Sequence, residues 1–308
     1  MKKIYKTFAW LVLASMANSA RAEEDVFFTE MPIVASVSRL PQKLSEAPAS
    51  VTVIDRDMIR ASGFRTVEDL LRLVPGFQVS SHNQDSAIAT YHGLNTGLNG
   101  EEYGVRLQVL VDGRSQYSPL FKSGVNWNLL PVVIENIERI EVIRGANTVA
   151  YGSNAFMGVV NIITQDTSQT KGWMFSANHG LNFIRDETLR WGGKVGNADV
   201  RFSYHALGDE GFQHAFYADL TDPHDSRKSK LFDLKVDFAL SNQDNVQVTL
   251  THAKDVSQFG RPDRPTTDPF RDLKQDSTSL GVQWRRVVNA DEELKVLYAY
   301  TEDRASSP

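Results

Sequence analysis

The side chains that could carry chemistry in this chain of 308 residues are its histidines and carboxylates, because it contains no cysteine. Without thiols, a disulfide framework, a zinc–thiolate site and a thiol nucleophile are excluded. The seven histidines show no close metal-ligand spacing: His82, His92, His179, His205, His214, His224 and His252. No nucleophile, general base and metal-ligand set occurs together, so we predict that the protein is not an enzyme and has no catalytic residue, metal site or cofactor.

One polar stretch combines His214 and His224 with three aspartates, Asp219, Asp222 and Asp225. Several carboxylates in one loop could hold a hard cation such as calcium. A solvated acidic loop is the simpler interpretation, and we assign no cation to it.

A second charged group lies on a short β-prone run at residues 137–143. Its members are Glu138, Arg139, Glu141 and Arg144. Side chains alternate along a strand, so Arg139 and Glu141 are expected on the same face. Such a face either pairs with charges on a neighbouring surface or is solvated.

The strand that carries these charges opens a longer stretch, 137–164, around which the other elements must be arranged. Gly145, Gly152 and Gly158 interrupt it, as turns and close backbone approaches require. It ends in a β-branched run at 159–164, which is typical of a buried strand.

Short strands and helices precede this stretch. Residues 50–54 alternate as a strand, and Asp55 predicts the N-cap of a helix at 56–61. Thr66 predicts the cap of a second helix, which Pro75 stops.

Further strands are expected at 77–79, 87–91 and 106–111. The last one leads into Asp112 and Gly113, a hairpin-turn signal. The aspartate could be a reactive group, but a turn residue is the simpler interpretation.

Four motifs in this region are P-x-S-V-T-V-I, D-L-L-R-x-V-P-G, V-L-V-D-G-R and E-x-I-R-G-x-x-x-x-x-Y-G-x-x-A-x-x-G-V-V-N-I-I-T. They resemble, in the same order, the plug domain of TonB-dependent outer-membrane receptors. The resemblance implies an α+β plug domain at residues 41–167. It also implies that four plug charges form ion pairs with the inner barrel wall: Glu138, Arg139, Glu141 and Arg144. His92 stands where the family often has arginine before a glycine, so no subfamily's substrate is carried over.

Residues 1–22 have the pattern of a cleaved secretory signal peptide, with a basic start, a short apolar centre and a small-x-small site ending at Ala22. The apolar run is too short for a transmembrane helix. An extended segment follows at 23–40. Six of its residues are similar to the TonB box, where the family's periplasmic coupling protein pairs as an added strand: Glu30, Met31, Pro32, Ile33, Val34 and Ala35.

Residues 168–308 contain runs that alternate apolar and polar side chains. The run at 231–240 places Phe232 opposite Asp233 and Lys235. Long polar connections alternate with short ones, which favours an outer-membrane barrel over a soluble sandwich. The predicted fold is therefore an α+β plug domain followed by the first six or seven antiparallel strands of an incomplete transmembrane β-barrel. Plugged transporters have about 22 strands, so a fragment or a truncated chain is expected.

The resemblance implies a receptor that imports a scarce metal chelate, most of all a ferric siderophore, with energy from the inner-membrane proton gradient. The expected partners are a TonB-type coupling protein, outer-membrane lipid and the chelate. A net charge of −5 gives no reason to expect nucleic acid. Haem or cobalamin are alternative substrates, and a truncated periplasmic protein that does not transport is the alternative function. Aromatic rings and an arginine in the plug loops are the predicted substrate contacts: Tyr91, Tyr103, Arg106, Tyr117 and Trp127.

Overall fold

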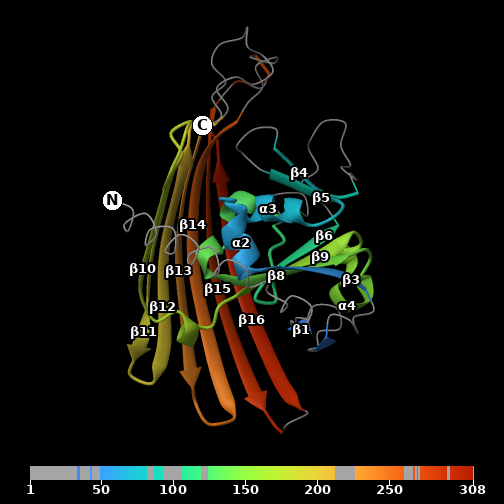
Figure 1. Cartoon of the computed structure of the whole chain (residues 1–308), viewed down its shortest axis with the longest axis vertical. Helices are drawn as coiled ribbons and strands as arrows, with labels where there is room; N and C mark the ends of the chain where they lie inside the picture. Colours follow the sequence, from blue (N-terminus) through green and yellow to red (C-terminus); the bar gives the residue numbers. More distant parts are fainter. Residues whose placement is uncertain are drawn as a thin grey trace, which may run out of the picture.

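The computed structural model describes residues 33–34, 42–43, 49–81, 87–92, 106–118, 124–211, 226–259, 266–267, 269, 271–289 and 292–307. An α+β plug lies against one face of a tall, curved antiparallel sheet, here called the wall (Figure 1). The predicted signal peptide and most of residues 23–40 lie outside the described ranges. No helix within those ranges is long and apolar enough to cross a membrane.

The plug is built from short elements. They are β1 (Ile33–Val34), β2 (Gln42–Lys43), β3 (Ser50–Asp55), α2 (Arg56–Ser62), α3 (Val67–Leu70), η4 (Leu71–Leu73), β4 (Phe77–Ser81), β5 (Ala87–Tyr91), β6 (Leu107–Val111), β7 (Arg114–Ser115), η6 (Trp127–Leu129), η7 (Ile134–Asn136), β8 (Ile137–Arg144), α4 (Thr148–Tyr151), η8 (Ser153–Ala155) and β9 (Gly158–Thr164). The main plug sheet has the order β3-β8-β9-β6-β7, with β6 and β9 parallel. The predicted strands at 50–54, 77–79, 87–91, 106–111, 137–143 and 159–164 are all confirmed to within two residues.

Local capping explains where the plug helices begin. The Asp55 carboxylate accepts a hydrogen bond of 2.8 Å from the Met58 amide, and Gly63 ends α2 with a φ of 67°. Thr66 is the N-cap of α3, as predicted, but its side chain does not cap the helix backbone. The Thr66 hydroxyl makes no bond to the helix backbone and instead donates to Asp69 Oδ2 at 3.0 Å.

The plug core lies between the main sheet and the helices. Ile54, Leu70, Leu71, Ile140 and Ile162 are fully buried in one hydrophobic cluster. Burial of these apolar side chains supplies most of the free energy that holds the sheet and helices together.

The wall contains seven strands in chain order, each antiparallel to the next. They are β10 (Gly172–His179), β11 (Arg185–Val195), β12 (Ala198–Asp209), β13 (Arg227–Ala239), β14 (Asp244–Phe259), β15 (Arg271–Val287) and β16 (Glu293–Ser306). Several strands are longer than predicted. For example, β13 begins at Arg227, four residues before the predicted run at 231–240, and β14 and β15 stay paired out to Phe259 and Arg271.

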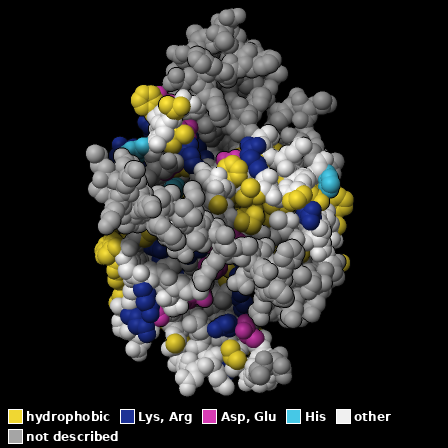
Figure 2. Space-filling view, in the orientation of Figure 1, with side chains coloured by type: hydrophobic (Ala, Val, Ile, Leu, Met, Phe, Trp, Pro, Cys, Tyr) yellow, Lys and Arg dark blue, Asp and Glu magenta, His cyan; other side chains and the backbone are white. Residues whose placement is uncertain are grey.

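The two faces of the wall have opposite polarity. On β13, Phe232 is 45% exposed on the outer face, whereas Asp233 and Lys235 are only 5% and 3% exposed on the face toward the plug. Hydrophobic side chains appear along the left margin of the molecule in Figure 2, where Figure 1 places the outer side of the wall. Buried polar and exposed apolar side chains are typical of a membrane barrel wall and reverse the pattern of a soluble sandwich.

The segment between plug and wall is not a solvated linker. It contains η9 (Thr167–Gln169), in which Thr167 is buried, and Thr170 is also buried. The Thr170 carbonyl lies over Gly192 of β11, where a Cβ atom would come within 2.0 Å of the carbonyl oxygen. The segment therefore packs on the wall at a position that requires glycine.

Candidate functional site

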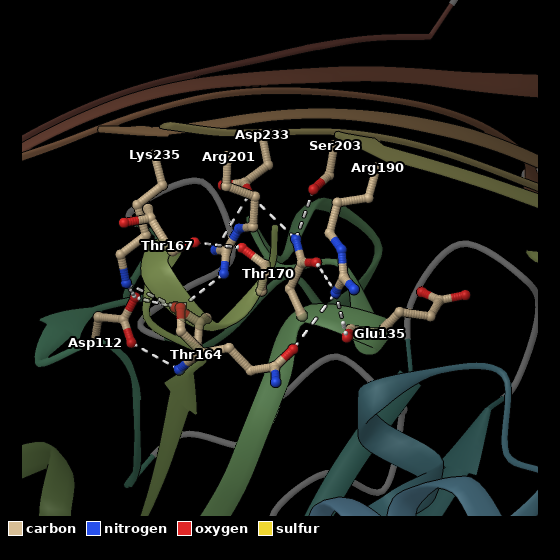
Figure 3. A network of polar contacts seen from close by, with 12 residues as sticks. Asp112, Glu135, Thr164, Thr167, Thr170, Arg190, Arg201, Ser203, Asp233 and Lys235 are labelled. Atoms are coloured by element: carbon tan, nitrogen blue, oxygen red, sulfur yellow. Dashed lines mark hydrogen bonds and ion pairs between the residues drawn. The ribbon is translucent and has the colours of Figure 1, made fainter. Parts of the chain in front are cut away.

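The polar interface between plug and wall is the candidate functional site, and its central contact is made by Asp112. The turn between β6 and β7 holds Asp112 and Gly113 at φ values of 49° and 80°, as a tight hairpin turn requires. The turn points the carboxylate at the wall, where Lys235 Nζ donates to Asp112 Oδ2 at 3.2 Å (Figure 3). Thr164 at the end of β9 completes the group by donating its amide and its hydroxyl to Asp112, both at 2.8 Å.

These contacts keep Asp112 ionised. Burial alone would raise its pKa, but the Lys235 ammonium and the two Thr164 donors outweigh burial and lower the pKa below its ordinary value. Lys235 also donates to the Thr164 hydroxyl at 2.9 Å. The charged pair is therefore hydrogen-bonded on both sides, as a buried ion pair must be to be tolerated.

A second group surrounds Arg201 of β12, which is 1% exposed. Its guanidinium donates to the Gln165 carbonyl at 2.7 Å and lies 3.5 Å from Asp233 Oδ1. Asn136 of the plug donates to Ser203 at 2.8 Å and to Asp233 at 3.3 Å. Figure 3 shows these side chains reaching across from the wall to the plug. The interface thus uses neutral amides and hydroxyls as well as charges.

Arg65, which follows α2, binds the wall through two aspartates. Its Nε and Nη2 donate to the two oxygens of Asp186, both at 2.7 Å, and its Nη1 donates to Asp209 at 3.1 Å. This bidentate geometry fixes orientation as well as distance.

Arg227 of β13 makes the remaining charged group. Its Nε donates to Asp255 Oδ1 at 2.9 Å, and its Nη1 lies 4.0 Å from Glu68 Oε1 of α3. Burial raises the pKa of Glu68, and the more distant Arg227 offsets this only in part. Asp112 and Glu68, two of the plug carboxylates at the interface, therefore respond to pH in opposite directions.

This arrangement holds the plug against the wall by many polar contacts, including those of Asp112, Arg201 and Arg65. The described residues contain no cluster of histidines and carboxylates that could hold a metal ion. The loop with His214 and His224 lies outside the described ranges.

Two of the four predicted pairing charges contact each other within the plug. Arg139 Nε donates to Glu141 Oε1 at 2.8 Å within β8, as their shared face predicted. Glu141 is fully buried in the plug sheet, and Glu138 and Arg144 are half-buried. The salt bridges described here that cross from plug to wall use Arg65, Glu68 and Asp112 instead.

The predicted substrate contacts are scattered. Trp127 is 6% exposed in the plug core, so it offers no free ring, and that expectation is corrected. Tyr91 packs beside Phe77 at 5.2 Å between ring centroids, and the Arg106 guanidinium lies 5.9 Å from the Phe156 ring centroid. Tyr117 is exposed, and Tyr103 lies outside the described residues.

Of the six TonB-box-like residues, Ile33 and Val34 are described. They form β1, which pairs with Lys43 and Gln42 of β2. These two residues are thus in the extended conformation that strand addition needs, with one side already paired.

Sequence reasoning missed the residues that join plug and wall. Asp112 was assigned its turn correctly, but its partner Lys235 is 123 residues away in the chain. One signal was available, since Asp233 and Lys235 were expected on the polar face of their strand. Nothing in the sequence marked Arg65 or Arg227.

A mixed domain seated on the polar face of an antiparallel sheet, with an apolar outer face, defines the class of plugged outer-membrane receptors. Residues 43–159 match the sequence profile of the TonB-dependent Receptor Plug Domain. The chain thus carries a TonB-dependent receptor plug domain, followed by antiparallel strands of a barrel wall.

Curated relatives agree. The vitamin B12 transporter BtuB of Vibrio cholerae is 31% identical over 180 residues, which span 58% of this chain and 27% of the relative. An iron-regulated outer membrane virulence protein of the same species is 32% identical over 182 residues, which span 58% of this chain and 26% of the relative. The match therefore spans about a quarter of these relatives' length, and they are transporters and outer-membrane proteins rather than enzymes.

Solved structures show the same fold. The ferripyoverdine receptor of Pseudomonas aeruginosa superposes with a TM-score of 0.68 at 15% identity, over 90% of this chain and 37% of that one. The ferric yersiniabactin uptake receptor FyuA of Yersinia pestis gives a TM-score of 0.67 at 15% identity, over 89% and 43%.

Proposed function

We propose that the chain is part of an outer-membrane receptor that imports a scarce metal chelate, and a ferric siderophore is the first candidate. Energy comes from the inner-membrane proton gradient through a TonB-type coupling protein. The observation that carries the proposal is the polar plug–wall interface around Asp112, Arg201, Arg65 and Arg227. An interface of hydrogen bonds can be rehydrated contact by contact, whereas an apolar core cannot.

In this mechanism the plug blocks the pore until the coupling protein pulls on the segment at residues 30–35. The coupling protein adds a strand to that segment by backbone hydrogen bonds. Cleavage after Ala22 accompanies export across the inner membrane and leaves the segment near the new N-terminus. Tyr91, Tyr103, Arg106 and Tyr117 remain the proposed substrate contacts. We further propose that Glu138, Arg139, Glu141 and Arg144 help to hold the plug against parts of the barrel beyond β16.

A corrinoid is the second candidate substrate, and the similarity to BtuB favours it specifically. Haem is a third. These ligands share flat, partly anionic surfaces that aromatic rings and arginine can bind. A periplasmic protein that binds without transporting is the alternative function.

The deciding experiment combines location with uptake. Membrane fractions are probed with an antibody against the plug, and cells with and without the gene are supplied with labelled ferric siderophores, haem or cyanocobalamin. We expect an outer-membrane band and gene-dependent uptake of one ligand that stops when the proton gradient is collapsed. A soluble periplasmic band without uptake would replace transport by the binding-only alternative.

The TonB-box-like segment has its own test. Val34→Pro removes one backbone donor from β1 and should abolish energised uptake while leaving ligand binding to cells unchanged. Val26→Pro, outside the six residues, is the matched control and should transport normally. Normal uptake by the Val34→Pro variant would remove this segment from the mechanism.

A further inference from the structure

A cavity of about 380 Å³ lies between helix α2 of the plug and the first three wall strands. Arg56, Arg60 and Phe64 line it from the plug, and Arg190 lines it from β11. Its volume is within the range of sites for small molecules. None of the contacts described above for the plug–wall interface uses Arg56 or Arg60.

The cavity carries an excess of positive charge. Arg56 and Arg60 are four residues apart on α2, so they lie on one helix face. Neither forms a hydrogen bond or salt bridge with another residue in the described part of the chain. The charged side chains that line the cavity are four arginines and two carboxylates, an excess of two positive charges: Arg56, Arg60, Arg65, Arg190, Glu135 and Asp186.

The surroundings of Arg56 disfavour its positive charge. Burial, with a further contribution from the charge of Arg60, lowers the pKa of Arg56. Glu138 and Asp57 oppose this shift, and because arginine keeps its proton in proteins, Arg56 and Arg60 both stay positively charged.

Two buried polar atoms in the cavity wall lack a partner. Glu135 Oε1 accepts from the Thr188 hydroxyl at 2.7 Å, but Glu135 Oε2 has no donor. Arg190 Nη1 makes three long contacts of 3.3–3.4 Å, and its Nε has no acceptor. Figure 3 shows the Glu135 carboxylate pointing away from the rest of the network. A ligand that satisfies both atoms must offer an acceptor and a donor together.

We propose that this cavity binds a small organic dianion that carries a hydroxyl group, a hydroxydicarboxylate. Its two carboxylates match the excess of two positive charges, and its hydroxyl donates to Glu135 Oε2. Ile59, Phe64 and Met174 supply apolar contact for the carbon skeleton.

The test uses calorimetric titration of the purified protein with malate, succinate and inorganic phosphate at low salt. Malate and succinate differ only in the hydroxyl. We expect malate to bind about tenfold more tightly than succinate, and Glu135→Ala to make the two equal. No energised membrane is needed, so a failure of transport leaves the result unaffected.

The arginines are tested with a matched control. Arg56→Gln and Arg60→Gln should each weaken malate binding about tenfold or more. Arg72→Gln, at an exposed arginine that pairs with Asp69 at 2.9 Å, should bind like the unchanged protein. Equal affinity in all three variants, or no malate binding, would overturn the site. Phosphate binding more tightly than malate would overturn the assignment to carboxylates.

Discussion

At the residue scale, Asp112 both forms the β6–β7 turn and binds Lys235 of the wall. Its backbone adopts a positive φ that few residues tolerate, and its side chain holds a lysine that is 3% exposed. Asparagine tolerates the same backbone conformation, so the charge can be removed without breaking the turn.

Asp112→Asn should therefore destabilise the attachment of plug to wall by about 3 kcal/mol, because Lys235 stays buried without its counter-charge. Hydrogen exchange of the β6–β7 and β9 amides would show the loss as faster exchange. Adding Lys235→Met to this variant should recover part of the lost stability, because it removes the buried lysine charge that no longer has a partner. Equal exchange in Asp112→Asn and the unchanged protein would mean that the pair contributes nothing.

The two plug carboxylates predict a pH profile. The pKa of Asp112 is lowered, so its contribution is present above the unfolded pKa of about 4 and is lost as pH falls through the folded pKa. The pKa of Glu68 is raised, so its contribution is present below the unfolded pKa and is lost as pH rises through the folded pKa. Acidification toward pH 5 should therefore stabilise the plug against denaturant through Glu68. Glu68→Gln should remove that gain, and parallel profiles for the two proteins would contradict it.

At the scale of elements, Gly192 of β11 allows the segment between plug and wall to pack closely on the wall. Gly192→Ala would place a Cβ within 2.0 Å of the Thr170 carbonyl oxygen, so η9 or β11 must move. We expect a loss of more than about 1 kcal/mol in stability to denaturant, since overpacking costs about 1–3 kcal/mol. Gly208→Ala on β12 is the control, because its nearest atoms would be 3.7 Å away. A similar effect in both variants would point to strand propensity instead of the contact.

The elements were the most predictable level of this fold. Alternation located the plug strands closely, and cap residues located the starts of the helices, because each signal lies within a few neighbouring residues. Strand ends in the wall were not predictable, since β14 and β15 continue where both faces are polar and the period-2 signal fades. The burial of Trp127 and the pairing of Asp112 with Lys235 depend on distant partners, so local sequence could not reveal either one.

At the scale of the whole molecule, the two faces of the wall suit different surroundings. Its outer residues, such as Phe232 and Leu240, suit lipid, and its inner residues suit the plug and water. Phe232→Arg places a charge near the middle of β13 and should cost about 2–4 kcal/mol in a membrane. Leu240→Arg, beyond the end of that strand, should cost about 0–1 kcal/mol. The amount of heat-modifiable protein in outer-membrane fractions measures the difference, and equal amounts would contradict a membrane-facing surface.

The position of β3 has a mechanical consequence. It is the first strand of the plug sheet after the N-terminal segment, and it lies at the sheet edge with β8 as its one neighbour. Once β1 and β2 have parted, tension on the chain before Ser50 therefore loads the six residue pairs between β3 and β8, and the rest of the sheet bears the load only after these pairs part. A single-molecule pulling trace would then show one small step in length, while the Asp112 contact at the far side of the sheet was still intact.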